Sequence, residues 1–292
     1  MIDTGLKDKI AIVTGANNPY GIGAGIAKAL VAQGAIVFLH YYRCGEEGQL
    51  PVHDKDIPGE TFYNTQRAKT PSEVLKAIRQ IGGQAEAWEA DLSIPDNISN
   101  LFDQAETTFG QVDILVNNAA HWEADTFLPS ADILVNKTVE AWTSAPDYIT
   151  ASSCDRVFAV NTRAVALAMA EFVRRQINRN GNWGRIINIS TDGAYCFPSE
   201  ISYGASKLAM EGYTRSAAQE FGQFGITVNT ISPGAIQTGW LTPEMETEIA
   251  ATYPMRRVGQ PDDIADAVVY FASEQARWIT GQRIYVGGGH AM

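Results

Sequence analysis

The sequence has few cysteines and no long run of apolar residues. Its three cysteines, Cys44, Cys154 and Cys196, are an odd number, which argues against a disulfide framework and indicates reduced thiols. Neither these cysteines nor the four histidines have metal-ligand spacing, so we predict no metal site. No apolar run approaches the ~20 residues of a membrane span, and the first residues lack the basic and apolar regions of a secretory signal. We therefore expect a cytoplasmic protein that does not bind membranes.

Positive charge is also scarce. The chain has 22 Lys and Arg against 33 Asp and Glu, a formal net charge of -11. Such an acidic surface repels a phosphate backbone, which excludes nucleic acid as an expected partner. The phosphates of a small cofactor would have to be bound by local backbone amides and one or two cations. The 292 residues are 45% hydrophobic and 19% charged, which is typical of a globular protein with a sizeable core.

Short segments rich in Ile and Val alternate with longer amphipathic segments. The predicted strands are 10–13, 36–39, 85–88, 114–116, 186–189, 227–231 and 283–286. The predicted helices are 23–33, 72–81, 98–109, 156–178, 202–221 and 262–272. The strands lack a clean apolar–polar alternation, as expected of strands that are covered on both faces. We predict one α/β domain over residues 1–292, a doubly wound (Rossmann) fold with a seven-stranded parallel sheet and helices on both faces.

A glycine-rich turn, Thr14-Gly-Ala-Asn-Asn-Pro-Tyr-Gly-Ile-Gly23, lies between the first predicted strand and the first predicted helix. Its glycines allow a tight turn and let backbone amides approach a pyrophosphate. The following helix N-terminus adds partial positive charge. This placement predicts a phosphate-binding site for a dinucleotide.

Tyr203 and Lys207 are four residues apart in a predicted helix, so both side chains emerge from one face. Lowering a phenol pKa from ~10 to near 7 requires about 4 kcal/mol, at roughly 1.4 kcal/mol per unit. One ammonium at ~4 Å, in an effective dielectric of ~20, supplies about that much. We therefore predict that Lys207 makes Tyr203 an acid or base near neutral pH.

The turn and the Tyr203–Lys207 pair together resemble the short-chain dehydrogenase/reductase family, over nearly the whole chain. The family's Thr-Gly-x-x-x-Gly-x-Gly turn is matched with two extra residues before Gly21, and Asn-Asn-Ala-Ala at 117–120 matches its Asn-Asn-Ala-Gly. Thr238-Gly-Trp240 and Trp278-Ile-Thr-Gly-Gln282 look closest to 3-oxoacyl-[acyl-carrier-protein] reductase-like members.

The resemblance implies a set of cofactor-binding residues in the glycine turn, at the ends of later strands and in the Pro-Gly segment that holds the nicotinamide. These are Thr14, Gly15, Asn17, Asn18, Tyr20, Gly21, Ile22, Gly23, Tyr41, Arg43, Asp91, Leu92, Asn118, Ala119, Ala120, Tyr203, Lys207, Pro233, Gly234, Ile236 and Thr238.

Cofactor choice depends on the end of the second predicted strand. An NAD enzyme usually has an acid there, which binds the ribose hydroxyls and repels a 2′-phosphate. This chain reads Leu39-His-Tyr-Tyr-Arg43, with no acid. Arg43 offers a fork of donors to a phosphate, so we predict NADP(H) in preference to NAD(H). The alternative is that Arg43 only begins a solvated loop, and the family's other basic position holds Tyr20.

The resemblance also implies a hydroxyl that binds the substrate oxygen. Counting along the strand from Arg185 gives Thr191, whereas counting back from Tyr203 gives Ser190; we favour Thr191 and keep both. Asn161 matches a helix asparagine that joins a water-linked proton relay. The implied reaction moves hydride between the nicotinamide and a carbonyl or alcohol, 3-oxoacyl-like or another ketone, while Tyr203 gives or takes the proton.

Two segments, 43–69 and 121–153, are longer than ordinary connections, and such loops usually have a function. We expect the first to be a surface excursion near the adenosine end of the cofactor. The second carries the aromatic residues Trp122, Phe127, Trp142 and Tyr148, and we expect it to cover substrate.

Three further expectations follow. The alternative function is a non-catalytic nicotinamide-binding sensor or assembly subunit. An enoyl reductase is a weaker rival, because relatives of that kind space the tyrosine and lysine more widely. By resemblance the chain forms a homo-oligomer, a tetramer or a dimer.

Overall fold

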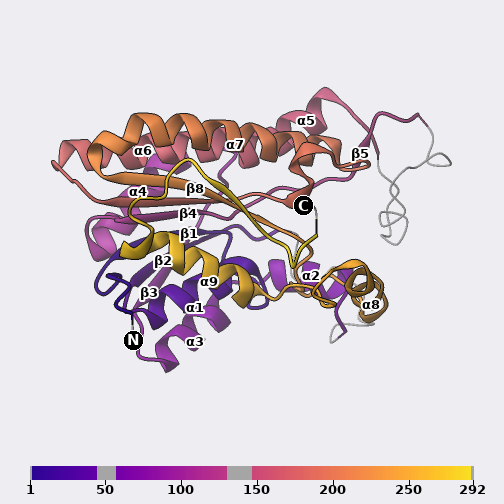
Figure 1. The fold of residues 1–292 in the computed structure, drawn as a ribbon, viewed down its shortest axis with the longest axis horizontal. Coiled ribbons are helices and arrows are strands. Elements are labelled where there is room, and N and C mark those ends of the chain that lie inside the picture. Colours follow the sequence, from indigo (N-terminus) through magenta and orange to yellow (C-terminus); the bar gives the residue numbers. More distant parts are fainter. Residues whose placement is uncertain (1, 45–56, 130–146, 291–292) are drawn as a thin grey trace.

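The computed structural model describes residues 2–44, 57–129 and 147–290 (Figure 1). Its main sheet has seven strands in the order β3-β2-β1-β4-β7-β8-β9, and every neighbouring pair is parallel. The strands are β1 (Ile10–Thr14), β2 (Ile36–Tyr41), β3 (Ala85–Glu89), β4 (Ile114–Asn117), β7 (Gly184–Ile189), β8 (Ile226–Pro233) and β9 (Arg283–Val286). The predicted doubly wound sheet is confirmed, and each predicted strand is present.

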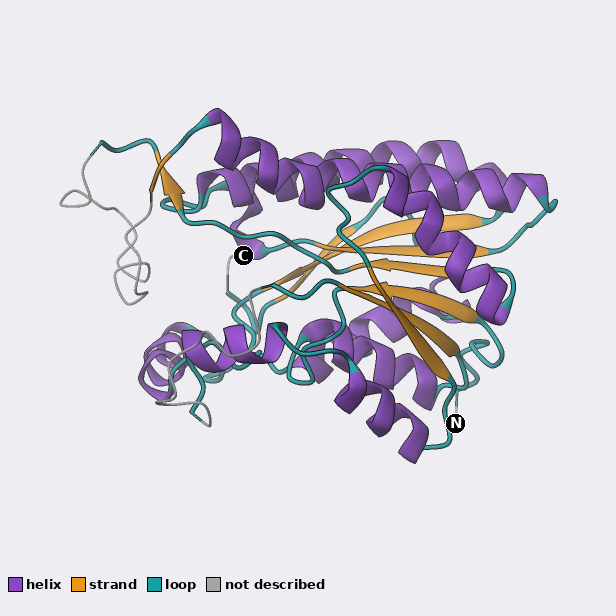
Figure 2. Ribbon diagram, turned by 180° about the vertical axis from the view of Figure 1, so that it is seen from behind, coloured by secondary structure: helices purple, strands orange, loops and turns teal. Residues whose placement is uncertain are grey.

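Helices cover both faces of this sheet (Figures 1 and 2). One layer contains α1 (Ile22–Ala32), α3 (Ser72–Gln80) and α9 (Pro261–Ala272); the other contains α4 (Asp96–Phe109), α6 (Val165–Asn178) and α7 (Ile201–Phe221). Alternate residues of β1 pack into the two layers: Ala11 and Val13 into the first, Ile10 and Ile12 into the second. Both faces of the strand are therefore buried, which explains why the sequence shows no alternation.

Three helices differ from the sequence prediction. The predicted helix 156–178 is α5 (Ala151–Phe158) and α6, joined by a π-helical segment, Ala159–Ala164. Two helices were not predicted, α2 (Glu60–Arg67) and α8 (Pro243–Thr252). They lie close together, since a side-chain atom on Gly59 would meet Thr242 at 3.5 Å and the Gly59 amide donates to the Gly239 carbonyl at 2.9 Å.

Both long segments are described in part. Residues 45–56 and 130–146, with Trp142, lie outside the described residues. In the second segment β5 (Asp125–Thr126) pairs with β6 (Asp147–Tyr148) in a small separate sheet. Among the residues that are described, no helix combines the length and apolar character needed to cross a bilayer.

Candidate active site

The predicted site residues lie at one edge of the sheet, because they follow the carboxyl ends of parallel strands. The positions at or just after these ends are Thr14 (β1), Tyr41 (β2), Asp91 (β3), Asn118 (β4), Thr191 (β7) and Pro233 (β8). The chain order reverses between β1 and β4, and ligands of doubly wound folds bind at this reversal. The structure therefore brings together residues that are more than 200 positions apart.

The glycine turn leaves room only for backbone. Gly15 has φ +69°, and a Cβ on Gly15 would lie 2.8 Å from Ala119 Cα. A Cβ on Gly23 would lie 2.4 Å from the Gly15 carbonyl oxygen and 2.7 Å from Asn118 Nδ2. Helix α1 starts at Ile22 with Gly21 as its N-cap, and no side chain caps its first amides. The turn thus fits an anion bound by backbone amides.

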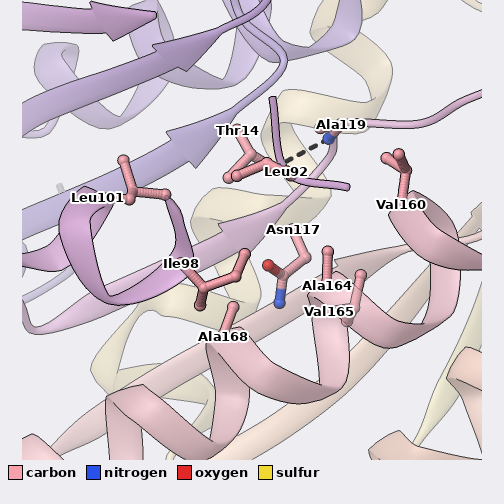
Figure 3. Close-up of a pocket in the computed structure, with 10 residues that line it drawn as sticks. All are labelled: Thr14, Leu92, Ile98, Leu101, Asn117, Ala119, Val160, Ala164, Val165 and Ala168. Carbon is pink, nitrogen blue, oxygen red and sulfur yellow. Dashed lines mark hydrogen bonds between the residues drawn. The ribbon is translucent and has the colours of Figure 1, made fainter. Parts of the chain in front are cut away.

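Thr14 and Asn118 join the turn to β4. The Thr14 hydroxyl accepts hydrogen bonds of 2.9 Å from the amides of Asn118 and Ala119, and Asn118 Nδ2 donates to the carbonyls of Thr14 (2.8 Å) and Gly15 (3.0 Å). Figure 3 shows Thr14 and Ala119 at the rim of a small pocket lined by Leu92, Ile98 and Ala168. This pocket is apolar and lies between α4 and α6, apart from Tyr203 and Lys207.

The lengthened part of the turn, residues 17–20, binds the turn to distant segments. Asn17 Nδ2 donates to the carbonyls of Arg67 (2.8 Å) and Lys69 (2.9 Å), at the end of α2. Asn18 Nδ2 donates to the carbonyl of Thr238 at 3.1 Å, in the segment after β8. Tyr20 is half-exposed, and its ring meets the Phe62 ring edge-on at 5.1 Å.

We expected the first long segment to be a surface excursion, but its described end, which contains α2, packs against the rest of the protein. Phe62 of α2 is 8% exposed and lies against Gly239, where an added Cβ would meet the Phe62 ring at 2.7 Å. Helix α2 therefore packs between the glycine turn and the segment after β8.

Tyr203 and Lys207 share a face of α7, as predicted. Lys207 Nζ donates to the Ile189 carbonyl at 2.8 Å and lies 5.7 Å from the centroid of the Tyr203 ring. Burial lowers the pKa of Lys207 to about 8, against the opposing effect of Glu211. The amine is thus mostly charged at neutral pH.

The predicted lowering of the Tyr203 pKa is wrong for this state of the protein. Burial raises the pKa of Tyr203, and the negative charges of Glu200 and Asp192 and the nearby Tyr63 raise it further. The prediction considered the ammonium alone, whereas desolvation of the phenol is the larger effect. Tyr203 is therefore protonated at neutral pH.

Asn161 lies in the π-helical segment and is fully buried. Its Oδ1 accepts from the His121 amide (2.8 Å), and its Nδ2 donates to the His121 carbonyl (2.8 Å) and to Ser206 Oγ (3.0 Å). Ser206 Oγ in turn donates to the Tyr203 carbonyl at 2.7 Å. Asn161 therefore connects the second long segment to the helix of Tyr203, and π-helical turns are frequent at functional sites.

Ser190 and Thr191 have different surroundings. Ser190 is 4% exposed, and its hydroxyl donates to Glu211 Oε1 at 2.5 Å. The same carboxylate oxygen lies 3.0 Å from Arg283 Nε, so Ser190 belongs to a buried charged network. Thr191 is partly buried, and among the described residues its Oγ1 makes only long hydrogen bonds, from the Gly193 amide (3.3 Å) and to Asp192 Oδ1 (3.4 Å).

Three further cofactor positions have defined contacts: Arg43, Asp91 and Gly234. Arg43 Nε lies 2.8 Å from Glu89 Oε1 at the end of β3, so its charge faces a carboxylate. Asp91 Oδ1 accepts from the Ser93 amide at 2.8 Å. At Gly234 an added Cβ would meet the Tyr253 hydroxyl at 2.9 Å, which favours glycine there.

Sequence reasoning missed Glu200. This residue is 6% exposed, and its Oε2 accepts from Trp122 Nε1 at 2.5 Å. Burial raises the pKa of Glu200 to about 7, and Asp125 and Asp192 add to the rise. Its position one turn before Tyr203 was a usable signal, but its burial depends on Trp122, 78 residues away. Within the described part of the chain, no group of three or more His, Cys, Asp or Glu side chains is suited to a metal.

Comparisons with known proteins agree with this architecture. Residues 59–291 match a family model described as Enoyl-(Acyl carrier protein) reductase. The chain is 32% identical to "Uncharacterized oxidoreductase YjdA" of Bacillus subtilis, with 97% of each chain covered. It is similar to a solved short-chain dehydrogenase/reductase from Serratia marcescens (TM-score 0.76, 28% identity, 98% of this chain and 99% of that chain). It is also similar to a blue fluorescent protein from a metagenomic library, solved in complex with NADPH (TM-score 0.75, 27% identity, 98% and 99% covered).

Proposed function

Because the chain belongs to the short-chain dehydrogenase/reductase family, we propose that it is an NADP(H)-dependent oxidoreductase that interconverts a carbonyl and an alcohol. The observation that carries this proposal is the placement of Tyr203 and Lys207 at the same sheet edge as the backbone-only glycine turn. A nicotinamide cofactor supplies the hydride chemistry when bound, and the protein supplies orientation and a proton.

We assign the residues as follows. Thr191 binds the substrate oxygen, because the Ser190 hydroxyl is committed to Glu211 and that of Thr191 makes only long bonds. Tyr203 gives its proton to this oxygen during reduction, and its raised pKa keeps the phenol protonated for that purpose. Lys207 then stabilises the phenolate charge.

We also propose that Asn161 belongs to a water-linked proton relay, as the family resemblance implies. Both groups of its amide are engaged, and they hold the backbone at His121 close to α7. This arrangement fits a residue that fixes the position of Tyr203, and a water-linked path would start from the same amide.

The cofactor preference is supported by two observations. Among the described residues that directly follow β2, 42–44, there is no acid, and the Glu89 carboxylate at the end of β3 is paired with Arg43. One similar solved protein holds NADPH. The glycine turn, Asn118 and the segment from Pro233 to Thr238 fit the phosphates and nicotinamide that the sequence predicts there.

We propose that the substrate is a small-molecule ketone, 3-oxoacyl-like or another, and that the protein is a cytoplasmic homo-oligomer, a tetramer or a dimer. The oligomer is supported by exposed apolar side chains near the edge strand β9, since such patches mark interfaces. Trp278 is 96% exposed, and Ile284 and Tyr285 are each 39% exposed.

The test is a panel of ketones, 3-oxoacyl thioesters and alcohols with NADPH and NADH, run on the wild type and on Tyr203→Phe. We expect turnover that falls by about 10²–10⁴ in the variant, while ADP-ribose affinity stays unchanged. Consumption of neither cofactor would favour the non-catalytic sensor or assembly subunit, whereas equal turnover rates for both proteins would show that Tyr203 is not the proton donor.

A further inference from the structure

Helix α2 brings a second arginine to the cofactor edge of the sheet. The Arg67 carbonyl accepts the 2.8 Å hydrogen bond from Asn17 Nδ2, so the end of α2 lies against the glycine turn. The Arg67 guanidinium donates through Nη2 to Cys44 Sγ at 3.2 Å, and Cys44 lies three residues beyond the end of β2. Arg67 therefore spans the space from the glycine turn to the end of β2.

The charge of Arg67 is differently placed from those of its neighbours. Arg43 Nε faces Glu89 at 2.8 Å, and Lys69 Nζ faces Glu73 at 3.1 Å. Within residues 2–44, 57–129 and 147–290, no carboxylate lies within 4 Å of the Arg67 guanidinium, which contacts the Cys44 sulfur and lies over the Tyr63 ring at 5.2 Å. The ring and the sulfur hold the guanidinium in place without cancelling its charge.

This location has a specific meaning in a doubly wound fold. The adenosine ribose of a dinucleotide lies between the glycine turn and the end of the second strand, and a nearby arginine accommodates a 2′-phosphate. A guanidinium presents several donors in a fixed fork, which suits a phosphate. The chain has a net charge of -11, so its overall field opposes the binding of a phosphate and a local cation is needed.

We propose that Arg67, from the inserted helix α2, is the residue that selects the 2′-phosphate of NADP(H), and that Arg43 acts indirectly by neutralising Glu89. This inference rests on the proposed cofactor preference and deepens it. The inserted helix α2 then contributes to cofactor specificity, and the hydrogen bonds of Asn17 hold the end of that helix against the glycine turn.

The experiment measures dissociation constants by titration calorimetry for 2′-phospho-ADP-ribose and ADP-ribose, which need no turnover. The proteins are the wild type, Arg67→Gln, Arg67→Lys and Arg79→Gln. The last is a matched control, because the exposed Arg79 of α3 pairs with Glu86 of β3. We expect Arg67→Gln to weaken the phosphorylated ligand by at least about tenfold, as for loss of a charge-assisted hydrogen bond, and to leave ADP-ribose within about twofold. Arg67→Lys should keep part of the preference, and Arg79→Gln all of it.

A second pair of variants separates the two arginines. Arg43→Gln exposes the Glu89 charge and should weaken the phosphorylated ligand, whereas Arg43→Gln with Glu89→Gln should restore affinity close to that of the wild type. If the double variant stays as weak as Arg43→Gln, Arg43 does not act through Glu89 and that part of the proposal is overturned. If Arg67→Gln keeps the full preference with an unchanged melting temperature, Arg67 is not the selecting residue. If the wild type binds both ligands equally, the proposed NADP(H) preference itself fails.

Discussion

Two hydroxyl groups follow β7, those of Ser190 and Thr191. We expect loss of the Thr191 hydroxyl to lower the reaction rate and loss of the Ser190 hydroxyl to lower the stability of the fold. Thr191→Ala removes the proposed donor to the substrate oxygen. Loss of one such donor lowers kcat by about 10²–10³. The fold should be little affected, because Thr191 Oγ1 accepts only a 3.3 Å bond from Gly193.

Ser190→Ala should have the opposite effect. Glu211 is 1% exposed, and the substitution removes a 2.5 Å hydrogen bond to its carboxylate. A hydrogen bond to a charged group contributes about 1.5–3 kcal/mol, which corresponds to a melting temperature lower by roughly 3–6 °C for a chain of this size. Activity at low temperature should remain within about tenfold of the wild type.

The assay pairs steady-state rates with thermal melting for both variants, and Thr191→Ser is the matched control that retains a hydroxyl. Thr191→Ser should keep most of the activity. The assignment is refuted if Ser190→Ala abolishes turnover at unchanged melting temperature while Thr191→Ala remains active.

Three other predictions concern burial and packing. Burial raises the pKa of Glu200 from 4.5 to about 7, so between these pH values the folded state keeps the proton that the unfolded state has lost. The free energy of unfolding should therefore fall by about 3 kcal/mol as the pH rises from 4.5 to 7. Glu200→Gln should flatten this part of the stability profile, which urea unfolding measures. A wild-type profile parallel to that of the variant would exclude this role. Gly23→Ala would place a Cβ 2.4 Å from the Gly15 carbonyl oxygen, and such overpacking costs about 1–3 kcal/mol. The variant should therefore bind ADP-ribose at least about fivefold more weakly. An unchanged affinity in titration calorimetry would contradict this expectation. Glu211→Gln breaks the buried contact with Arg283 at 3.0 Å and should lower stability by about 3–5 kcal/mol in denaturant unfolding, whereas a loss below about 1 kcal/mol would show that the network is dispensable.

The sheet was predictable from the sequence because its strands are apolar on both faces and are separated by amphipathic helices. Helix α2 was missed because its only buried side chains are Phe62 and Gln66, too few for an apolar stripe. Helix α8 carried a clear start signal that was overlooked, with Thr242 as N-cap accepting from the Met245 amide and Pro243 in the first turn.

The sequence predicts the positions of the candidate site residues, but not how deeply each is buried or which charges surround it. Spacing placed Tyr203 and Lys207 on one face of α7, and this is confirmed. Spacing gave no information on burial, so the direction of the Tyr203 pKa was wrong and Glu200 was missed. The turn motif predicts where a phosphate would bind, whereas the contact between Asn17 and the end of α2 depends on a segment 50 residues away.

Isotope labelling tests most directly whether the protein transfers hydride from the nicotinamide to a carbonyl carbon. NADPH carrying deuterium at both positions of nicotinamide C4 is incubated with the protein and a ketone that it turns over, and the product is examined by mass spectrometry and NMR. We predict one deuterium on the carbon that bears the new hydroxyl, and about 10²–10⁴-fold less of this product per unit time from Tyr203→Phe. Deuterium on a carbon beside an intact carbonyl, as an enoyl reductase would leave it, or product without deuterium, would contradict it.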